Sequence, residues 1–184
     1  MPRLPEVTSR DSLPEAQRHI FDYLQETRGG VRLPFSVILN HPEVCYRVAH
    51  VGSFARFDSS LPKDVIEAAT CVAAREFECN FEWAAHARAA AENGVSAAAM
   101  DVISNKKGTG SLSDQEKLVI GFARQLLEDH RVDDDTWNAA VANWGANGAL
   151  ELTMTVGYYG MLACLLNVTQ VEPPEGSPRM PGAK

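Results

Sequence analysis

The sequence is poor in cysteine, and none of its cysteines form a C-x-x-C pair. Cys45, Cys71, Cys79 and Cys164 are the only four in 184 residues. A chain of this length can bury enough apolar surface to fold without disulfides. We therefore expect free thiols in a reducing cytoplasm. Cys45, Cys71 and Cys164 are most simply interpreted as small core residues.

Concentrated positive charge is also missing. The net charge is −7, and no stretch gathers Lys or Arg on one face. Nucleic acids and anionic membranes are therefore poor partners on electrostatic grounds. The first residues contain no apolar segment of signal-peptide length, so we expect no secretion and a cytoplasmic location.

No apolar run reaches the usual length of a membrane span. The most apolar stretch, residues 150–166, is interrupted by Glu151, by Thr153 and Thr155, and by two glycines. A spanning helix generally needs 18 or more apolar residues in succession. We therefore predict a buried core helix here.

Signals for β-structure are absent as well, since no segment alternates convincingly at period two and no hairpin turn is apparent. The sequence predicts an all-α, single-domain bundle of about eight helices with short loops. We expect a flexible N-terminal arm over residues 1–12, a helical domain over 13–170 and a Pro-rich tail over 171–184.

Several helix boundaries carry local signals. Ser12 is a candidate cap for a first helix that ends at Gly29, and Ser59 or Ser60 for the helix that contains Pro62 in its first turn. Further helices are predicted from Pro42 to about residue 57, over about 81–93 with Asn80 as cap, and over 96–103. A capping box at Ser113 predicts a helix that reaches residue 127. The last two helices are predicted over 136–144 and, after a break at 145–148, to about residue 168.

One stretch, residues 67–86, combines Glu67, Cys79, Glu82 and His86. Glu82 and His86 are four residues apart, so both project from one face of a helix. On spacing alone, a surface pair worth a few tenths of a kcal/mol is the simplest interpretation. A metal site would need about three or four ligands, and nothing nearby completes the set, so we expect no metal and no other cofactor.

The same residues give the chain a resemblance to the carboxymuconolactone decarboxylase family, which includes alkylhydroperoxidase D. The pattern of the latter is a Glu, a Cys twelve residues later, a second Cys three further on and a His four beyond. These steps fall on Glu67, Cys79, Glu82 and His86. The resemblance covers roughly residues 12–170. It implies an alkylhydroperoxidase D-like helical fold and a homo-oligomer, whether dimer, trimer or hexamer.

The departure from this pattern concerns Glu82. In the peroxidase, the matching position holds the thiol that attacks peroxide, and the position of Cys79 holds the thiol that resolves the disulfide. Glutamate forms neither a sulfenic acid nor a disulfide, so that cycle cannot run here in its known form. Cys79 could still react alone, with Cys71 as its resolving partner, which leaves a peroxidase as an alternative.

The groups that match the pattern favour acid–base chemistry on a small organic acid or lactone. The decarboxylases of the family remove a carboxylate and leave an enolate-like charge, which needs a proton donor. By resemblance, we predict His86 as the main acid or base, Glu82 as the residue that orients it and Glu67 as its partner. Arginine would suit an anionic substrate, and five are candidates: Arg32, Arg47, Arg56, Arg75 and Arg88.

Four aromatic residues are candidates for a substrate pocket, namely Trp83, Phe35, Tyr158 and Tyr159. Packing in the core or between subunits is the alternative for each of them, because buried aromatic side chains mainly supply contact area. A third hypothesis for the whole chain is a non-catalytic helical oligomer that has kept the family's scaffold.

Overall fold

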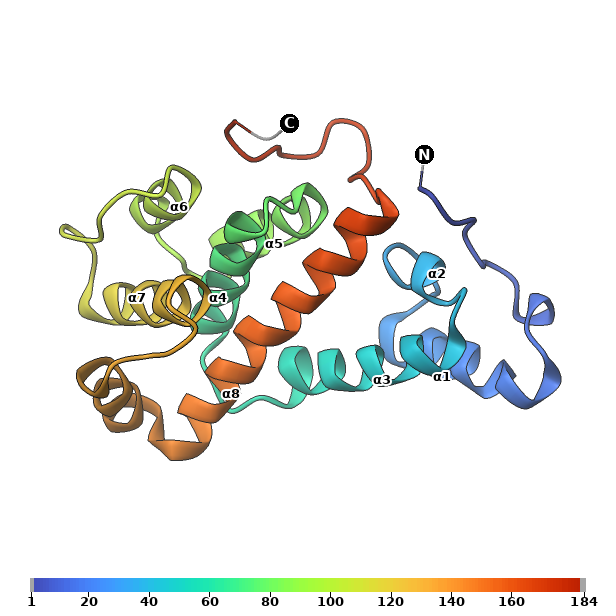
Figure 1. The fold of residues 1–184 in the computed structure, drawn as a ribbon, viewed down its shortest axis with the longest axis horizontal. Helices are drawn as coiled ribbons and strands as arrows, with labels where there is room; N and C mark the ends of the chain where they lie inside the picture. Colours follow the sequence, from blue (N-terminus) through green and yellow to red (C-terminus); the bar gives the residue numbers. More distant parts are fainter. Residues whose placement is uncertain (1, 183–184) are drawn as a thin grey trace. The chain divides into compact units, whose positions relative to one another are not determined.

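The computed structural model describes residues 2–182, which form helices and loops without a single strand (Figure 1). The helices are α1 (Arg18–Arg28), α2 (Phe35–Ile38), α3 (Pro42–Ser53), α4 (Lys63–Glu76), α5 (Asn80–Glu92), α6 (Ala97–Ser104), α7 (Asp114–Glu128) and α8 (Asp134–Thr169). Short 3-10 turns precede α1, and one π-helical turn, Phe54–Asp58, follows α3. The all-α prediction of about eight helices is confirmed.

The chain divides into two compact units. The first contains the described residues up to Asp58 together with Leu165–Glu172, and the second contains Ser59–Cys164 and the described residues from Pro173 onwards. Helix α8 begins in the second unit and ends in the first. Met1, Ala183 and Lys184, which belong to the predicted arm and tail, lie outside the described residues.

Hydrogen bonds hold the N-terminal segment within the first unit. The Ser36 hydroxyl donates to Glu6 at 2.7 Å, the Val7 amide donates to the Ser36 carbonyl at 2.8 Å, and the Asn40 side chain donates to the Pro5 carbonyl at 2.7 Å. The segment that the sequence predicted as a flexible arm is thus hydrogen-bonded to α2 and the turn that follows it.

The predicted caps of α1 and α4 are wrong. Ser12 ends a 3-10 turn, and α1 begins six residues later, because Leu13 precedes a proline and is held extended at φ −95° and ψ 146°. Ser59 and Ser60 do not cap α4. Pro62 occupies the N-cap position, while both serine hydroxyls donate to Glu151 at 2.8 and 3.1 Å.

Helix α4 forms the centre of the second unit. Every residue from Val65 to Ala74 is buried, and the helix packs against α5, α6 and α7. Other predicted boundaries agree with the structure. Ser113 and Glu116 form the capping box that begins α7. Gly145 adopts φ 69°, which breaks the helical path inside α8.

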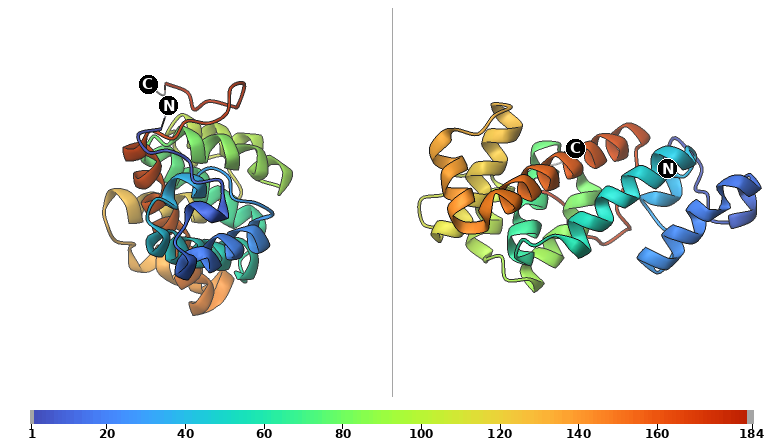
Figure 2. Two further views of the ribbon diagram at one scale, coloured as in Figure 1. Left: turned by 90° about the vertical axis from the view of Figure 1, so that its right-hand side faces the viewer. Right: turned by 90° about the horizontal axis from the view of Figure 1, so that it is seen from below.

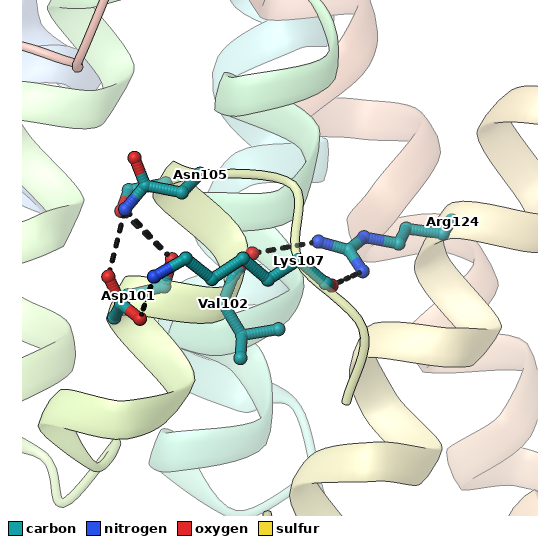
Figure 3. A network of polar contacts seen from close by, with 6 residues as sticks. Asp101, Val102, Asn105, Lys107 and Arg124 are labelled. Atoms are coloured by element: carbon teal, nitrogen blue, oxygen red, sulfur yellow. Dashed lines mark hydrogen bonds and ion pairs between the residues drawn. The ribbon is translucent and has the colours of Figure 1, made fainter. Parts of the chain in front are cut away.

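A polar network ties α7 to the end of α6 (Figure 3). Arg124 on α7 donates to the carbonyl oxygens of Val102 at 3.0 Å and Lys107 at 2.7 Å. Lys107 in turn pairs with Asp101 at 2.7 Å, and Asn105 donates to the same carboxylate at 2.9 Å. The network satisfies carbonyl groups near the C-terminus of α6 and fixes the start of the following loop.

After the break at Gly145, α8 continues as one rod to Thr169 (Figures 1 and 2). By length and composition it is the one helix of residues 2–182 that could cross a membrane, but 56% of its most apolar window is buried inside the structure. Gly160 faces Phe77, the residue that ends α4, so closely that an added Cβ would lie 2.9 Å from the Phe77 ring. Glycine therefore permits α8 to approach the end of α4.

Candidate active site

The junction between α4 and α5 positions the candidate catalytic residues. Glu78 adopts the left-handed conformation at φ 50°. The Cys79 amide donates to the Ala74 carbonyl at 2.8 Å, and the Glu78 amide donates to the Arg75 carbonyl at 3.2 Å. This is the Schellman pattern, which ends one helix and turns the chain sharply. Helix α5 therefore begins immediately after α4 and packs against it.

The N-cap of α5 is Cys79 rather than the predicted Asn80. The reason is the Schellman motif, whose last residue is Cys79. Because Cys79 is extended at φ −89° and ψ 97°, helical geometry begins one residue later. Glu82 still falls in the first turn of α5, as the sequence predicted, and there the helix dipole favours its carboxylate form.

Glu67, Glu82 and His86 converge on one buried point. The Nδ1 atom of His86 lies 2.7 Å from Glu67 Oε2, and its Nε2 atom lies 3.4 Å from Glu82 Oε2. The exposed fractions are 8% for Glu67, 3% for Glu82 and 5% for His86. A surface pair of Glu82 and His86 is therefore excluded. The imidazole is instead held between two carboxylates, one from each helix, with the shorter contact to Glu67.

This arrangement favours the protonated imidazole. Burial lowers the pKa of His86, but the hydrogen bonds to Glu67 and Glu82 and the charges of both carboxylates outweigh burial and raise it to about 9. The raised pKa favours the imidazolium at neutral pH, with Nδ1 hydrogen-bonded to Glu67 and Nε2 facing the Glu82 carboxylate. Glu67, Glu82 and His86, hereafter the triad, form a buried cluster with a proton to donate.

The aromatic candidates lie in different surroundings. Tyr159 stands edge-on to the His86 ring with 4.8 Å between ring centroids, and Tyr158 packs against Tyr159 at 5.0 Å. Trp83 is 5% exposed and belongs to the hydrophobic core of the second unit. The packing alternative therefore describes Trp83 well, whereas Tyr159 directly contacts the triad.

Phe35 belongs to the first unit. There its ring lies 4.1 Å from the guanidinium carbon of Arg28, and its carbonyl oxygen accepts a weak bond from the Cys45 thiol at 3.8 Å. Arg28 also donates to the Ala49 carbonyl at 2.8 Å. These contacts are those of a residue that packs α2 within its own unit.

The thiols differ in their surroundings. Cys79 is buried at the N-terminus of α5. Cys71 lies one turn beyond Glu67 on α4, and burial together with the charge of Glu67 raises the pKa of its thiol. Burial likewise raises the pKa of Cys45 to about 12. Cys71 and Cys45 are therefore poor nucleophiles. Cys164 is exposed, which corrects its prediction as a core residue, because it lies on the open face of α8.

Both ring nitrogens of His86 are directed at carboxylate oxygens of the triad. Within residues 2–182, no three or more His, Cys, Asp or Glu side chains are arranged to hold a metal.

Comparison with known proteins finds solved structures of similar fold. No protein-family model matches the chain, and no curated protein matches its sequence. An alkylhydroperoxidase AhpD core, an uncharacterized peroxidase-related protein from Ralstonia eutropha JMP134, superposes with a TM-score of 0.76, over 95% of this chain and 93% of that one, at 16% identity. The fold is AhpD-like. A second solved structure, an uncharacterized peroxidase-related protein from Silicibacter sp. TM1040, has a TM-score of 0.69 at 15% identity, over 96% of this chain and 97% of that one.

Proposed function

We propose that this AhpD-like protein is an enzyme that performs acid–base chemistry without a cofactor, decarboxylating or isomerising a small organic acid or lactone. The observation that supports the proposal is the buried His86 imidazole between Glu67 and Glu82. A buried charged group of this kind is costly unless it is paired, and perturbed ionisable groups concentrate at functional sites.

In the proposed decarboxylation, His86 is the proton donor. The carbon–carbon bond to the departing CO₂ breaks and leaves its electron pair on carbon as an enolate. The proton on Nε2 then passes to that carbon, and the neutral imidazole regains a proton from solvent. Nε2 is the suitable atom because its contact to Glu82, at 3.4 Å, is weaker than the 2.7 Å contact of Nδ1 to Glu67.

Under this proposal, the two carboxylates have different roles. Glu67 orients the ring through the shorter hydrogen bond, a role that the sequence had predicted for Glu82. In an isomerisation, Glu82 would accept a proton from carbon and His86 would return one. A negatively charged substrate would meet the positive charge of His86. Arg75 and Arg88 are bound elsewhere, by the Ser104 carbonyl and by Glu92.

The test is turnover of a panel of small lactone acids and 3-oxo acids, followed by CO₂ release and by ultraviolet absorbance. We expect activity in the wild type and in Cys79→Ser, and a loss of about 10²-fold or more in His86→Gln, the range for general acids. The exposed His130 provides a matched control as His130→Gln. Full activity in His86→Gln would refute the proposed role of this residue.

A thiol peroxidase that uses Cys79 is the second candidate. The observation in its favour is the position of Cys79 at the N-cap of α5, where the helix dipole stabilises a thiolate. The thiolate would attack a hydroperoxide, release an alcohol and become a sulfenic acid, which an external dithiol would reduce back to the thiol. Peroxide consumption with dithiothreitol tests this reaction. Consumption that persists unchanged in Cys79→Ser would exclude it.

A further inference from the structure

An uncharged seam runs along the exposed side of α8. It consists of Leu150, Met154, Gly157, Met161 and Cys164, spaced alternately four and three residues apart. Leu150 is 60% exposed and Met161 43%, Gly157 and Cys164 are exposed, and Met154 is partly exposed. This heptad spacing is the pattern by which one helix packs against another along a narrow stripe.

Gly157 is the unusual member of this seam. Glycine is unfavourable inside a helix, so it needs a reason to be there. Two other glycines of α8 have one, since an added Cβ would meet Trp144 at Gly148 and Phe77 at Gly160. At Gly157 an added Cβ meets nothing within 4 Å. No described residue fills the space beside Gly157, so this space is open to a second molecule.

The distribution of charge on α8 limits which kind of molecule can pack against the seam. Residues 152–169 contain no charged side chain, and Glu151 at the edge of the seam is bound by Ser59 and Ser60. A chain of net charge −7 repels its own copies over most of its surface, but not through this face. A membrane is disfavoured, because helices that lie on lipid carry Lys or Arg beside their apolar face.

The seam is also complementary to itself when reversed. In an antiparallel pair, Gly157 of one copy faces Met161 of the other, and Met154 faces Cys164. Both methionines then meet a small residue, and Leu150 lies opposite Val168. A parallel, in-register pair would instead place glycine opposite glycine and methionine opposite methionine. A two-fold axis perpendicular to α8 produces the antiparallel contact twice, as a symmetric dimer requires.

We propose that α8 pairs antiparallel with α8 of a second copy of this chain through the seam of Leu150, Met154, Gly157, Met161 and Cys164. The proposal concerns assembly alone and is independent of the chemistry at the triad. It gives the homo-oligomer expected from the family resemblance a defined contact, and it places Cys164 at a subunit interface.

Gly157→Lys tests the pairing at a position where an added Cβ meets nothing within 4 Å. Gly121→Lys is the matched control, since Gly121 is a helical glycine of α7 that also has open space around it. Sedimentation velocity is measured over about 1 to 100 µM, because an interface formed by one helix pair is small and associates weakly.

We expect wild type and Gly121→Lys to form the same dimer or multiple of dimers, and Gly157→Lys to have half that mass with an unchanged circular dichroism spectrum. The proposal is overturned if the wild type is monomeric throughout, if Gly157→Lys retains the wild-type mass, or if the wild type binds neutral phosphatidylcholine vesicles but not itself.

Disulfide trapping tests the direction of the pair. Met154→Cys should give a covalent dimer under mild oxidation, through a bond from position 154 of one copy to Cys164 of the other. Ala142→Cys, at an exposed position of α8 outside the seam, is the control and should stay uncrosslinked, as should wild type. A wild-type dimer linked through Cys164 alone would indicate a parallel pair and overturn the antiparallel arrangement.

Discussion

Replacing Glu67 by Gln should remove most of the pH dependence that His86 confers on stability. Glutamine keeps the size of the side chain and an oxygen that can accept from Nδ1, but it removes the negative charge. The pKa of His86 is about 9 in the folded protein, against an ordinary value of 6.5. This difference of about 2.5 pH units corresponds to about 3 kcal/mol of folding free energy, at about 1.4 kcal/mol per unit.

The sign follows from the raised pKa. The folded state binds the His86 proton more tightly than the unfolded state, so the stabilisation is fully present below pH 6.5 and is lost as the pH rises through 9. Without Glu67, only Glu82 opposes burial, which by itself lowers the pKa of His86. We therefore expect the loss of stability between pH 6 and pH 9.5 to fall from about 3 kcal/mol to below about 1 kcal/mol.

The assay is urea unfolding at several pH values, with the free energy of unfolding extrapolated to water. Glu92→Gln is the control, because Glu92 pairs with Arg88 on the exposed face of the same helix and leaves His86 untouched. A pH dependence in Glu67→Gln as steep as that of the wild type would refute the electrostatic account of the triad.

Two further predictions concern the scaffold. Ser113→Ala breaks the capping box with Glu116 and should cost about 1 kcal/mol of stability, measured by urea unfolding; no change would show that the cap contributes nothing. Gly160→Ala forces a Cβ against the Phe77 ring and should cost about 1–3 kcal/mol, whereas Gly121→Ala, which has open space, should be neutral or stabilising in the same thermal scans. Equal effects of the two glycine changes would contradict the close packing of α8 on the end of α4.

Local signals in the sequence predicted much of the fold. The Ser113-x-x-Glu116 capping box, the left-handed Gly29 at the end of α1 and the break at Gly145 each act within a few residues, and each is where it was predicted. The caps at Ser12 and Ser59 or Ser60 failed for a reason that is also local. A following proline, or proline itself at the N-cap, keeps the backbone extended and delays the helix.

The relation of Glu67 to His86 could not be predicted in the same way. The spacing of Glu82 and His86 follows from helical geometry alone. The 2.7 Å contact between Glu67 and His86 depends on the junction of α4 and α5, where Glu78 adopts a left-handed conformation that is uncommon for residues other than glycine. The shorter hydrogen bond therefore belongs to the carboxylate that is 19 residues away rather than four.

The sequence also did not reveal which side of α8 is exposed. Because Cys164 lies in an apolar stretch, the sequence predicted that both the stretch and Cys164 are buried. Helical geometry turns Gly157, Met161 and Cys164 to the outside, while Leu162 and Ala163 between them are buried. Which face of an apolar helix is covered depends on its tertiary partners, and composition does not reveal it.

The central claim, a buried imidazolium held by two carboxylates, is tested most directly by the nitrogen chemical shifts of His86. The protein is labelled with ¹⁵N at histidine, the His86 signals are assigned by their absence in His86→Gln, and spectra are recorded at pH 7.5. The structure predicts that Nδ1 and Nε2 are both protonated and that the ring titrates near pH 9. A neutral ring at pH 7.5, with one protonated nitrogen, would contradict the claim.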